Sequence, residues 1–422
     1  MASCLGTVRA ALVIACCWVV VACGGGGSGS FGGSGSFGGS GSNPPPPSTG
    51  NVASVIVDQG PSTQNPSVNT LFTSVTICLP GSTTGCQTID HIQVDTGSYG
   101  LRILAPVLTL TLPVETLANG NSLAECTHFV DGYSWGPVAL ADMQIAGETA
   151  KSLPVQVIGD SRFTTVPANC SSTGVTQEDT VMAFGANGII GIGPFVLDCG
   201  DCDTNAAEGF YYACATATTC TETAVPDAMQ VANPVTFFAV DNNGIMIDLP
   251  AVAATGAVTL TGSLIFGIDT QSNNQSGTQT VLTVDDMADL LMTFNNQTLA
   301  NSFIDSGSNG IYFADSSIAT CTETGLTNFY CPGSTLLVGP LSIEGTNMVT
   351  VNNLTFNVGD TQTILTTAPT DTYNVLPQLA GTLPAANAGS FDYGLAFFYG
   401  KRVAVAVEGN KTSVGTGPYI AF

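Results

Sequence analysis

The 422-residue sequence predicts an all-β protein with two lobes and few short helices. From about residue 51 onward, short runs of alternating apolar and polar residues are separated by Gly, Pro, Asn and Asp, which is the pattern of strands and turns. Helical spacing is found chiefly in two stretches, residues 226–232 and 285–294. A short acidic motif occurs twice, 210 residues apart, which indicates a duplicated lobe.

The composition narrows the class of partner. There are 31 Asp and Glu residues against seven Lys and Arg, and the formal net charge is −24. Nucleic acid binding requires clustered Lys and Arg, so we expect no nucleic-acid partner. Charged residues make up only 9% of the chain, which is typical of secreted, turn-rich β proteins.

The N-terminus has the features of an export signal. Arg9 precedes an apolar run over residues 10–22, which is too short for a comfortable membrane span. The run ends in VVAC at 20–23, which resembles a bacterial lipobox, so we predict a lipoprotein signal peptide over 1–23 and lipidation of Cys23. Gly24 after this Cys favours an exported protein anchored by lipid to the outer membrane. An ordinary signal peptide cut nearby is the alternative.

The rest of the chain divides into a linker and a body. Residues 24–50 are rich in Gly, Ser and Pro, and a coil of this length spans roughly 25–30 Å. We expect this linker to hold the body away from the membrane. The body is predicted to comprise an N-terminal lobe over 51–274 and a C-terminal lobe over 275–422.

Ten cysteines follow Cys23, and an even number in an exported chain predicts five disulfides. Close spacing pairs Cys78 with Cys86 and Cys321 with Cys331, and Cys126 with Cys170 follows by elimination. The pairing is left open among Cys199, Cys202, Cys214 and Cys220. A metal site in this last group is disfavoured because no His lies nearby.

The repeated motif carries the predicted chemistry. It reads IQVDTGSYG at 92–100 and FIDSGSNG at 303–310, so an apolar strand delivers an Asp into a Thr/Ser-Gly-Ser turn. Two adjacent carboxyl groups cannot both ionise easily and therefore share a proton. The ionised group can activate water while the protonated group donates to a carbonyl oxygen. Two unrelated surface turns are the alternative. The predicted catalytic pair is Asp95 and Asp305, supported by Thr96, Gly97, Ser98, Ser306, Gly307 and Ser308.

These motifs resemble those of the pepsin-like aspartic proteases, in the same order along the chain. The two active-site segments of that family resemble VDTGSYGLRI and FIDSGSNGIYFADSSI. Other family segments resemble GIIGIG at 188–193, GSLIFGIDT at 262–270 and FDYGLAFFYGKRVAVAVEG at 391–409. The resemblance covers roughly residues 51–422. It implies the bilobal acid protease fold and peptide-bond hydrolysis through a bound water.

The flap of that family resembles residues 129–147, and two departures occur there. The usual flap tyrosine falls on Phe129, and the tryptophan that supports it falls on Arg102. The resemblance implies that Phe129, Gly132 and Tyr133 close over an extended peptide. Hairpin packing is the other expected role for Tyr133 and for Trp135. Both departures favour the alternative function, a non-catalytic surface binding lipoprotein that uses the same cleft.

The sequence gives little support for other kinds of hydrolytic or metal site. His91 and His128 are the only histidines, so a Ser-His-Asp site would need one of them beside an activated Ser, and no zinc ligand set is present. The acidic segment 198–208 lacks the central Gly and terminal Glu of a calcium loop. We therefore expect no cofactor and no metal. We expect a monomeric envelope protein that contacts the membrane only through its lipid anchor and acts on a peptide or protein substrate.

Overall fold

The computed structural model describes residues 50–130, 132–171, 175–366, 373–383 and 389–422. The predicted signal peptide, the linker up to residue 49 and Cys23 lie outside the described residues. Within them, strands dominate, so the predicted all-β class is confirmed. The α-helices of the described part are short: α1 (Ala168–Ser171), α2 (Val181–Phe184) and α3 (Thr361–Thr366).

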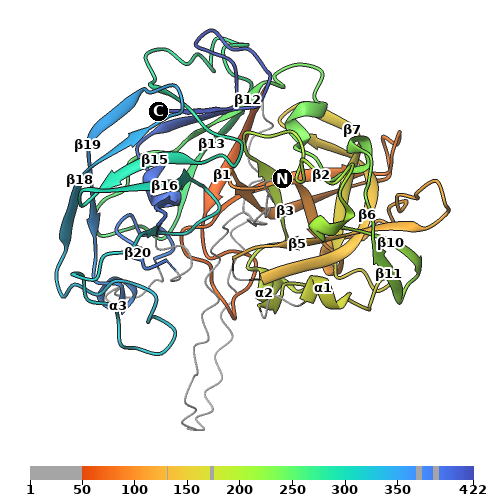
Figure 1. Cartoon of the computed structure of the whole chain (residues 1–422), viewed down its shortest axis with the longest axis horizontal. Coiled ribbons are helices and arrows are strands. Elements are labelled where there is room, and N and C mark those ends of the chain that lie inside the picture. The colour runs from red at the N-terminus through yellow and green to blue at the C-terminus, as the bar shows by residue number, and fades with distance from the viewer. Residues whose placement is uncertain (1–49, 131, 172–174, 367–372, 384–388) are drawn as a thin grey trace, which may run out of the picture.

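The larger of two sheets has 16 strands and extends from one lobe into the centre of the molecule (Figure 1). Many of its strands are apolar runs that are buried on both faces, whereas a few alternate between buried and exposed residues. Its strands are β1 (Val52–Val57), β2 (Leu71–Cys78), β3 (Cys86–Asp95), β4 (Tyr99–Leu104), β5 (Ser122–His128), β6 (Gly132–Ile145), β7 (Glu148–Ile158), β8 (Thr176–Gln177), β9 (Gly188–Ile192), β10 (Tyr211–Thr216), β11 (Thr219–Glu222), β12 (Gly244–Asp248), β13 (Leu260–Phe266), β14 (Val281–Thr283), β22 (Arg402–Ala406) and β23 (Tyr419–Ala421).

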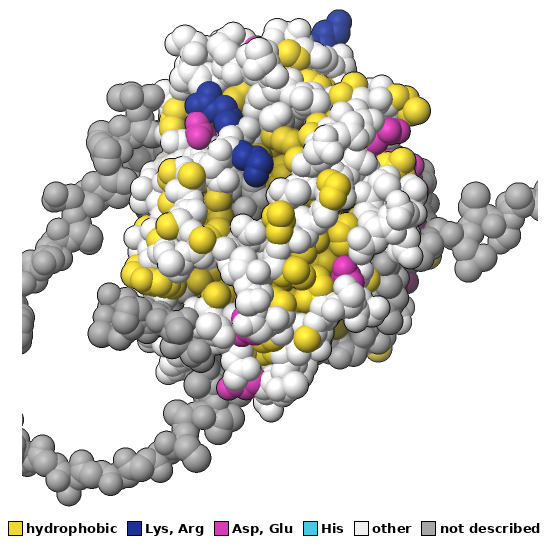
Figure 2. All heavy atoms as spheres, turned by 90° about the vertical axis from the view of Figure 1, so that its left-hand side faces the viewer, with side chains coloured by type: hydrophobic (Ala, Val, Ile, Leu, Met, Phe, Trp, Pro, Cys, Tyr) yellow, Lys and Arg dark blue, Asp and Glu magenta, His cyan; other side chains and the backbone are white. Residues whose placement is uncertain are grey.

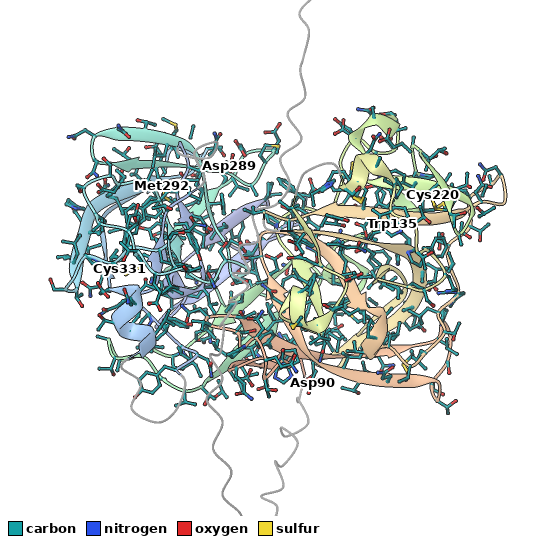
Figure 3. The ribbon with its side chains drawn as sticks, turned by 90° about the horizontal axis from the view of Figure 1, so that it is seen from below. Asp90, Trp135, Cys220, Asp289, Met292 and Cys331 are labelled. Carbon is teal, nitrogen blue, oxygen red and sulfur yellow. A yellow bond between two sulfur atoms is a disulfide. The ribbon has the colours of Figure 1, made fainter. Side chains whose placement is uncertain are left out.

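The smaller sheet has seven strands and builds the second lobe, on the left of Figure 1. Figure 3 shows the same division from below, with Met292 and Cys331 in this lobe and Trp135 and Cys220 in the other. The predicted two-lobed, all-β architecture is therefore confirmed. The strands of this sheet are β15 (Leu290–Phe294), β16 (Gln297–Ile304), β17 (Ile311–Tyr312), β18 (Leu336–Glu344), β19 (Thr350–Val358), β20 (Ala380–Gly381) and β21 (Asp392–Tyr393).

Strands from both halves of the chain pair in the centre of the molecule. β1 pairs with β13, β12 with β22, and β22 with β23, so the C-terminal strands complete the large sheet. β14 also joins this sheet through β23. The sheets therefore do not separate at a single residue, and the lobe boundary near residue 275 stays a prediction.

The strongest misprediction concerns residues 285–294. Their spacing predicts a helix, but β15 occupies Leu290–Phe294 between β16 and β18. Leu290, Met292 and Phe294 are buried while Leu291 and Thr293 are exposed, so the alternation of a strand overrides the helical spacing. At 226–232, only a short 3₁₀ turn forms, over Asp227–Met229.

All five predicted disulfides are present. Cys78–Cys86, Cys321–Cys331 and Cys126–Cys170 pair as expected. The pairing that the sequence leaves open is Cys199–Cys202 and Cys214–Cys220. Four of the five close loops of ten residues or fewer, so they fix local turns rather than join the lobes.

The surface matches the low charge content of the sequence. The face in Figure 2 carries mainly uncharged polar and apolar side chains, with few acidic or basic ones. In the described part of the chain, no helix has both the length and the apolar character needed to cross a membrane.

Candidate active site

The first Asp turn follows the buried C-terminal end of β3. β3 pairs with β2 on one side and in parallel with β9 on the other, which places Asp95 beside Gly191. The chain turns immediately, so the N–H of Gly97 donates to Oδ1 of Asp95 at 2.8 Å. The hydroxyl of Ser98 donates to Oδ2 of the same carboxyl group. Both oxygens of Asp95 are therefore held by its own turn.

The second Asp turn repeats this arrangement in the other lobe. β16 pairs in parallel with β21 and ends at Ile304, one residue before Asp305. The N–H of Gly307 donates to Oδ1 of Asp305 at 2.7 Å, and the hydroxyl of Ser308 donates to Oδ2 at 3.0 Å. The predicted duplication thus extends to the hydrogen-bond donors, because a Gly N–H and a Ser hydroxyl hold the carboxyl group in each turn.

The two turns are joined by hydrogen bonds across the lobes. The N–H of Ser306 donates to Oγ1 of Thr96 at 2.9 Å, and the N–H of Thr96 donates to Oγ of Ser306 at 3.2 Å. The Ser306 hydroxyl in turn donates to the carbonyl oxygen of Val94 at 2.8 Å. These bonds fix the two turns face to face.

The carboxyl groups of Asp95 and Asp305 meet at this junction and form a side-chain hydrogen bond. Both residues are 0% exposed. The approach depends on glycine: a methyl group at Gly97 would lie 2.8 Å from Cγ of Asp305, and one at Gly307 would lie 2.8 Å from Cγ of Asp95. The structure therefore brings together the predicted pair and all six supporting residues.

The environment holds a proton on this pair. Burial raises the pKa of Asp95, while hydrogen bonds from Asp305, Ser98 and Gly97 oppose the shift. Burial raises the pKa of Asp305 well above its usual range, and the charge of Asp95 raises it further. Asp95 is thus the better anion and Asp305 the better acid, which is the unequal pair that acid–base hydrolysis requires.

Arg102 does not neutralise the pair. Its guanidinium donates to Glu125 at 2.5 Å and to Asp198 at 2.9 Å, and all three side chains are buried. Burial disfavours the charged guanidinium, but these two acids more than offset this, so the pKa of Arg102 is raised. Burial, with the charge of Glu125, raises the pKa of Asp198 well above its usual range. Arg102 therefore joins β4 to β5 through its ion pair with Glu125, and its positive charge also lowers the pKa of Asp95.

The flap hairpin forms, but its predicted substrate residues pack inward. Phe129 is 5% exposed and stacks edge-on against Phe184. Tyr133 is buried beside His128 and Gln177, and Gly132 lies against Glu178. None of the interactions described for these residues reaches Asp95 or Asp305. Their role in substrate binding stays a prediction.

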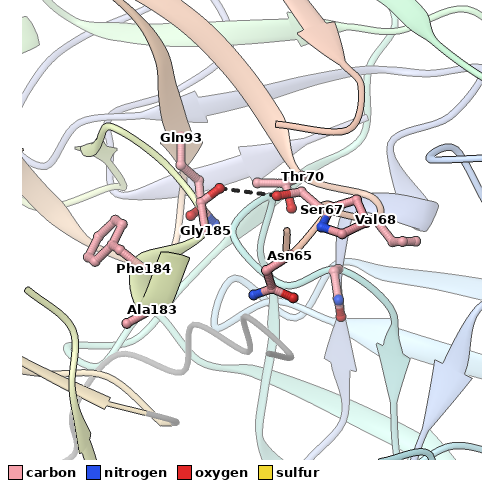
Figure 4. Close-up of a pocket in the computed structure, with 10 residues that line it drawn as sticks. Asn65, Ser67, Val68, Thr70, Gln93, Ala183, Phe184 and Gly185 are labelled. Atoms are coloured by element: carbon pink, nitrogen blue, oxygen red, sulfur yellow. Dashed lines mark hydrogen bonds between the residues drawn. The ribbon is translucent and has the colours of Figure 1, made fainter. Parts of the chain in front are cut away.

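A small cavity borders the second Asp turn (Figure 4). Gln93 and Phe184 lie on one side of it and Asn65 on the other, and the Ser67 hydroxyl closes the gap by donating to the carbonyl oxygen of Gly185 at 3.1 Å. Its volume is about 20 Å³, enough for about one water molecule and too small for a peptide side chain.

Both histidines have structural partners. His91 is only partly exposed and contacts Asp58 and Asp90, each at 3.3 Å. His128 lies close to Cys126 and Cys170, a grouping with the residue types of a metal site. These two cysteines form a disulfide, so their sulfurs are not free thiolates that could bind a metal.

Sequence reasoning missed several buried acids: Glu125 and Asp198 beside Arg102, and Asp392 beside the dyad. The available signal was an acid within an apolar run, as in GSFDYGLAF at 389–397. That signal is weak, because an isolated acid in a strand is usually exposed.

Comparison with known proteins gives a family without an established activity. The family model described as "Protein of unknown function (DUF3443)" matches residues 47–422, so the chain belongs to this family. No curated protein is significantly similar in sequence. Among solved structures, an aspartic proteinase from Irpex lacteus is similar at 14% identity and a TM-score of 0.48, covering 88% of this chain and 96% of that one.

Proposed function

We propose that the protein is an aspartic endopeptidase of the cell envelope. The observation that carries this proposal is the buried, hydrogen-bonded pair of Asp95 and Asp305, each held by a Gly N–H and a Ser hydroxyl. Buried acids without a counter-charge cost several kcal/mol, and packing gives no reason to place two of them together. A shared proton between them supplies both a base and an acid.

The residues act in two steps on a peptide bond. Asp95 accepts a proton from a water molecule as the water oxygen attacks the carbonyl carbon, and Asp305 donates its proton to the carbonyl oxygen. The resulting diol collapses when one of its hydroxyl protons returns to Asp305 and the proton on Asp95 moves to the leaving nitrogen. The pair ends with the single proton it began with, so the cycle needs no metal.

Substrate access requires movement, because both catalytic side chains are 0% exposed. The flap hairpin packs against an apolar cluster that includes residues of both lobes. Val130 packs against the cluster that contains Tyr312 and Phe329 of the second lobe. Opening this contact would separate the flap from the second lobe and admit an extended peptide.

The experiment is a cleavage assay with the purified protein and denatured protein substrates from pH 3 to 7, with and without pepstatin. The proposal expects pepstatin-sensitive cleavage that is lost in Asp95→Asn and Asp305→Asn. Absence of cleavage at every pH by a folded wild-type protein would reject it.

A non-catalytic binding protein is the second candidate. It is favoured by Phe129, which lacks the flap hydroxyl and packs against Phe184, and by the ion pairs that engage Arg102. Under this alternative, the folded protein binds peptides and cleaves none. Binding that is unchanged in Asp305→Asn would support it.

We further propose an exported monomer anchored to the outer membrane through a lipid on Cys23, with no nucleic-acid partner. The VVAC sequence at 20–23 and the net charge of −24 support this proposal. A single acyl chain binds membranes weakly, so stable anchoring needs more than one chain. Fractionation of cells that express the Cys23→Ser variant tests it: release from the membrane fraction is expected, and retention would contradict it.

A further inference from the structure

A third buried acid lies in the same core as the dyad. Asp392 begins β21, where it pairs in parallel register with Phe303 of β16, two residues before Asp305. On its other side, β21 pairs with β17, and Tyr312 is the register partner of Asp392. Asp392 is 0% exposed, and no hydrogen bond of ordinary geometry reaches either of its carboxyl oxygens.

The equivalent position in the first lobe is apolar. There, Gln93 lies two residues before Asp95 and pairs in parallel register with Ile189. The same site in the repeated motif thus holds an isoleucine in one lobe and a carboxylic acid in the other. Among the described residues this fully buried acid has no ion-pair partner, which is unfavourable for packing alone, so a chemical role accounts for it better than a structural one.

Asp392 is connected to the dyad through Ser308. The N–H of Leu395, just beyond β21, donates to the carbonyl oxygen of Ser308 at 2.7 Å and holds this turn against the strand. The Ser308 hydroxyl donates to Asp305 at 3.0 Å, and the Asp392 carboxyl group lies beside Ser308. The N–H of Asp305 also donates to Tyr393 of β21 at 3.0 Å.

The groups that face Asp392 from the packed elements are acidic or neutral. Asp95 and Asp305 face it from the two active-site turns, Tyr312 belongs to β17, and Tyr393 follows it in β21. The Tyr312 hydroxyl is engaged with Asn309. In the described part of the chain, none of the ion pairs formed by Arg, Lys or His involves Asp95, Asp305 or Asp392.

Asp95 is expected to ionise before the other two acids. Asp95 is first, because three hydrogen bonds favour its charged form. Burial raises the pKa of Asp392 well above its usual range, and Ser308 opposes this while the charge of Asp95 adds to it. Burial also raises the pKa of Asp305 well above its usual range, and the charges of Asp95 and Asp392 raise it further.

We propose that Asp392 is a positioning residue that, by placing an ionisable carboxyl group beside Ser308, keeps the proton on Asp305 at pH values nearer neutral. The proposal rests on the proposed peptidase function. It goes beyond that function because it explains how an acid centre can work outside strongly acidic surroundings. The part played by Asp392 is electrostatic, since its side chain does not touch the reacting atoms.

The first test compares pH profiles of kcat/KM for the full chain, wild type against Asp392→Asn, which cannot ionise. The alkaline midpoint should fall by about one pH unit, which is about a tenfold loss on that limb, while the acid limb stays in place. Asp392→Ile, which copies the other lobe, should show the same shift if Asn impairs folding. The matched control Asp286→Asn, at an exposed acid of the second lobe, should leave the profile unchanged.

The second test needs no peptidase activity. The free energy of unfolding is measured against pH for wild type, Asp392→Asn, Asp305→Asn and the double variant. The proposal expects non-additive effects that grow between pH 4 and pH 7, because the two acids then repel each other. If the wild type cleaves nothing but this coupling is present, the peptidase proposal fails and the acid cluster stands. Additive effects together with an unmoved alkaline limb would overturn the role of Asp392.

Discussion

The turn around Asp95 and the turn around Asp305 have the same internal hydrogen bonds but different surroundings. In each, a Gly N–H and a Ser hydroxyl hold the carboxyl group. Behind Asp95 the strand pair contributes Gln93 and Ile189, whereas behind Asp305 it contributes Phe303 and Asp392. The two turns therefore hold their carboxyl groups in the same way, while the layers behind them differ by one acid.

The largest expected effect comes from breaking the pair itself. Asp95→Asn and Asp305→Asn each remove one half of the shared-proton system, so we expect kcat/KM to fall by about 10³-fold or more in either variant. The two losses should be similar, because neither acid works alone. A variant that keeps more than a tenth of wild-type activity would contradict this symmetry. Circular dichroism serves as the control for folding.

The next effect concerns the glycines that allow the two turns to approach. Gly97→Ala and Gly307→Ala each place a methyl group 2.8 Å from Cγ of the opposing Asp. Overpacking of this kind costs about 1–3 kcal/mol, and it should also separate the carboxyl groups. We expect lower unfolding free energies in urea and activity reduced by about 10²-fold in both variants. A stable, active alanine variant would show that the approach is looser than the structure indicates.

The pH dependence of the free energy of unfolding should differ between Asp305 and Asp360, an acid outside the dyad. Burial raises the pKa of Asp305 above its unfolded value, so its contribution to stability is fully present below about pH 4 and is lost as pH rises through the folded pKa. Asp360 has a lowered pKa because of Thr363, so its contribution is lost as pH falls. As pH rises, the free energy of unfolding of Asp305→Asn should therefore increase relative to that of wild type. That of Asp360→Asn should decrease relative to wild type over the same change.

The smallest expected effect distinguishes the two serines. Ser98→Ala removes a donor that lowers the pKa of Asp95, so the acid limb of the pH profile should move upward by about half a unit. Ser308→Ala removes a donor from the acid that stays protonated, so the acid limb should not move. Equal shifts in the two variants would mean that both acids carry the charge equally.

The sequence predicted the Asp turns well because their geometry is local. A strand, a Gly and a Ser within four residues determine the hydrogen bonds at Asp95 and at Asp305. Cys78–Cys86 and Cys321–Cys331 were predictable for a similar reason, since their cysteines are close in sequence, whereas the pairing among the four cysteines at 199–220 was left open. The pairing of the two turns followed from their duplication.

Features that depend on distant contacts were not predictable. Strand β15 forms because β16 and β18 flank it, not because of its own spacing. Asp392 becomes part of the acid centre only through the register of β21 with β16. Arg102 finds Glu125 and Asp198 through contacts 23 and 96 residues away. A single sequence carries at most a weak local signal for these contacts.

The most direct test of the central claim is the titration of the Asp carboxyl carbons by NMR in ¹³C-labelled protein, with Asp95→Asn and Asp305→Asn to assign the signals. We predict coupled behaviour: one of the pair ionises in the acid range and the other retains its proton to a much higher pH, and each substitution alters the titration of the remaining partner. Two independent titrations near pH 4, each unaffected by loss of the other acid, would contradict a shared proton between the lobes.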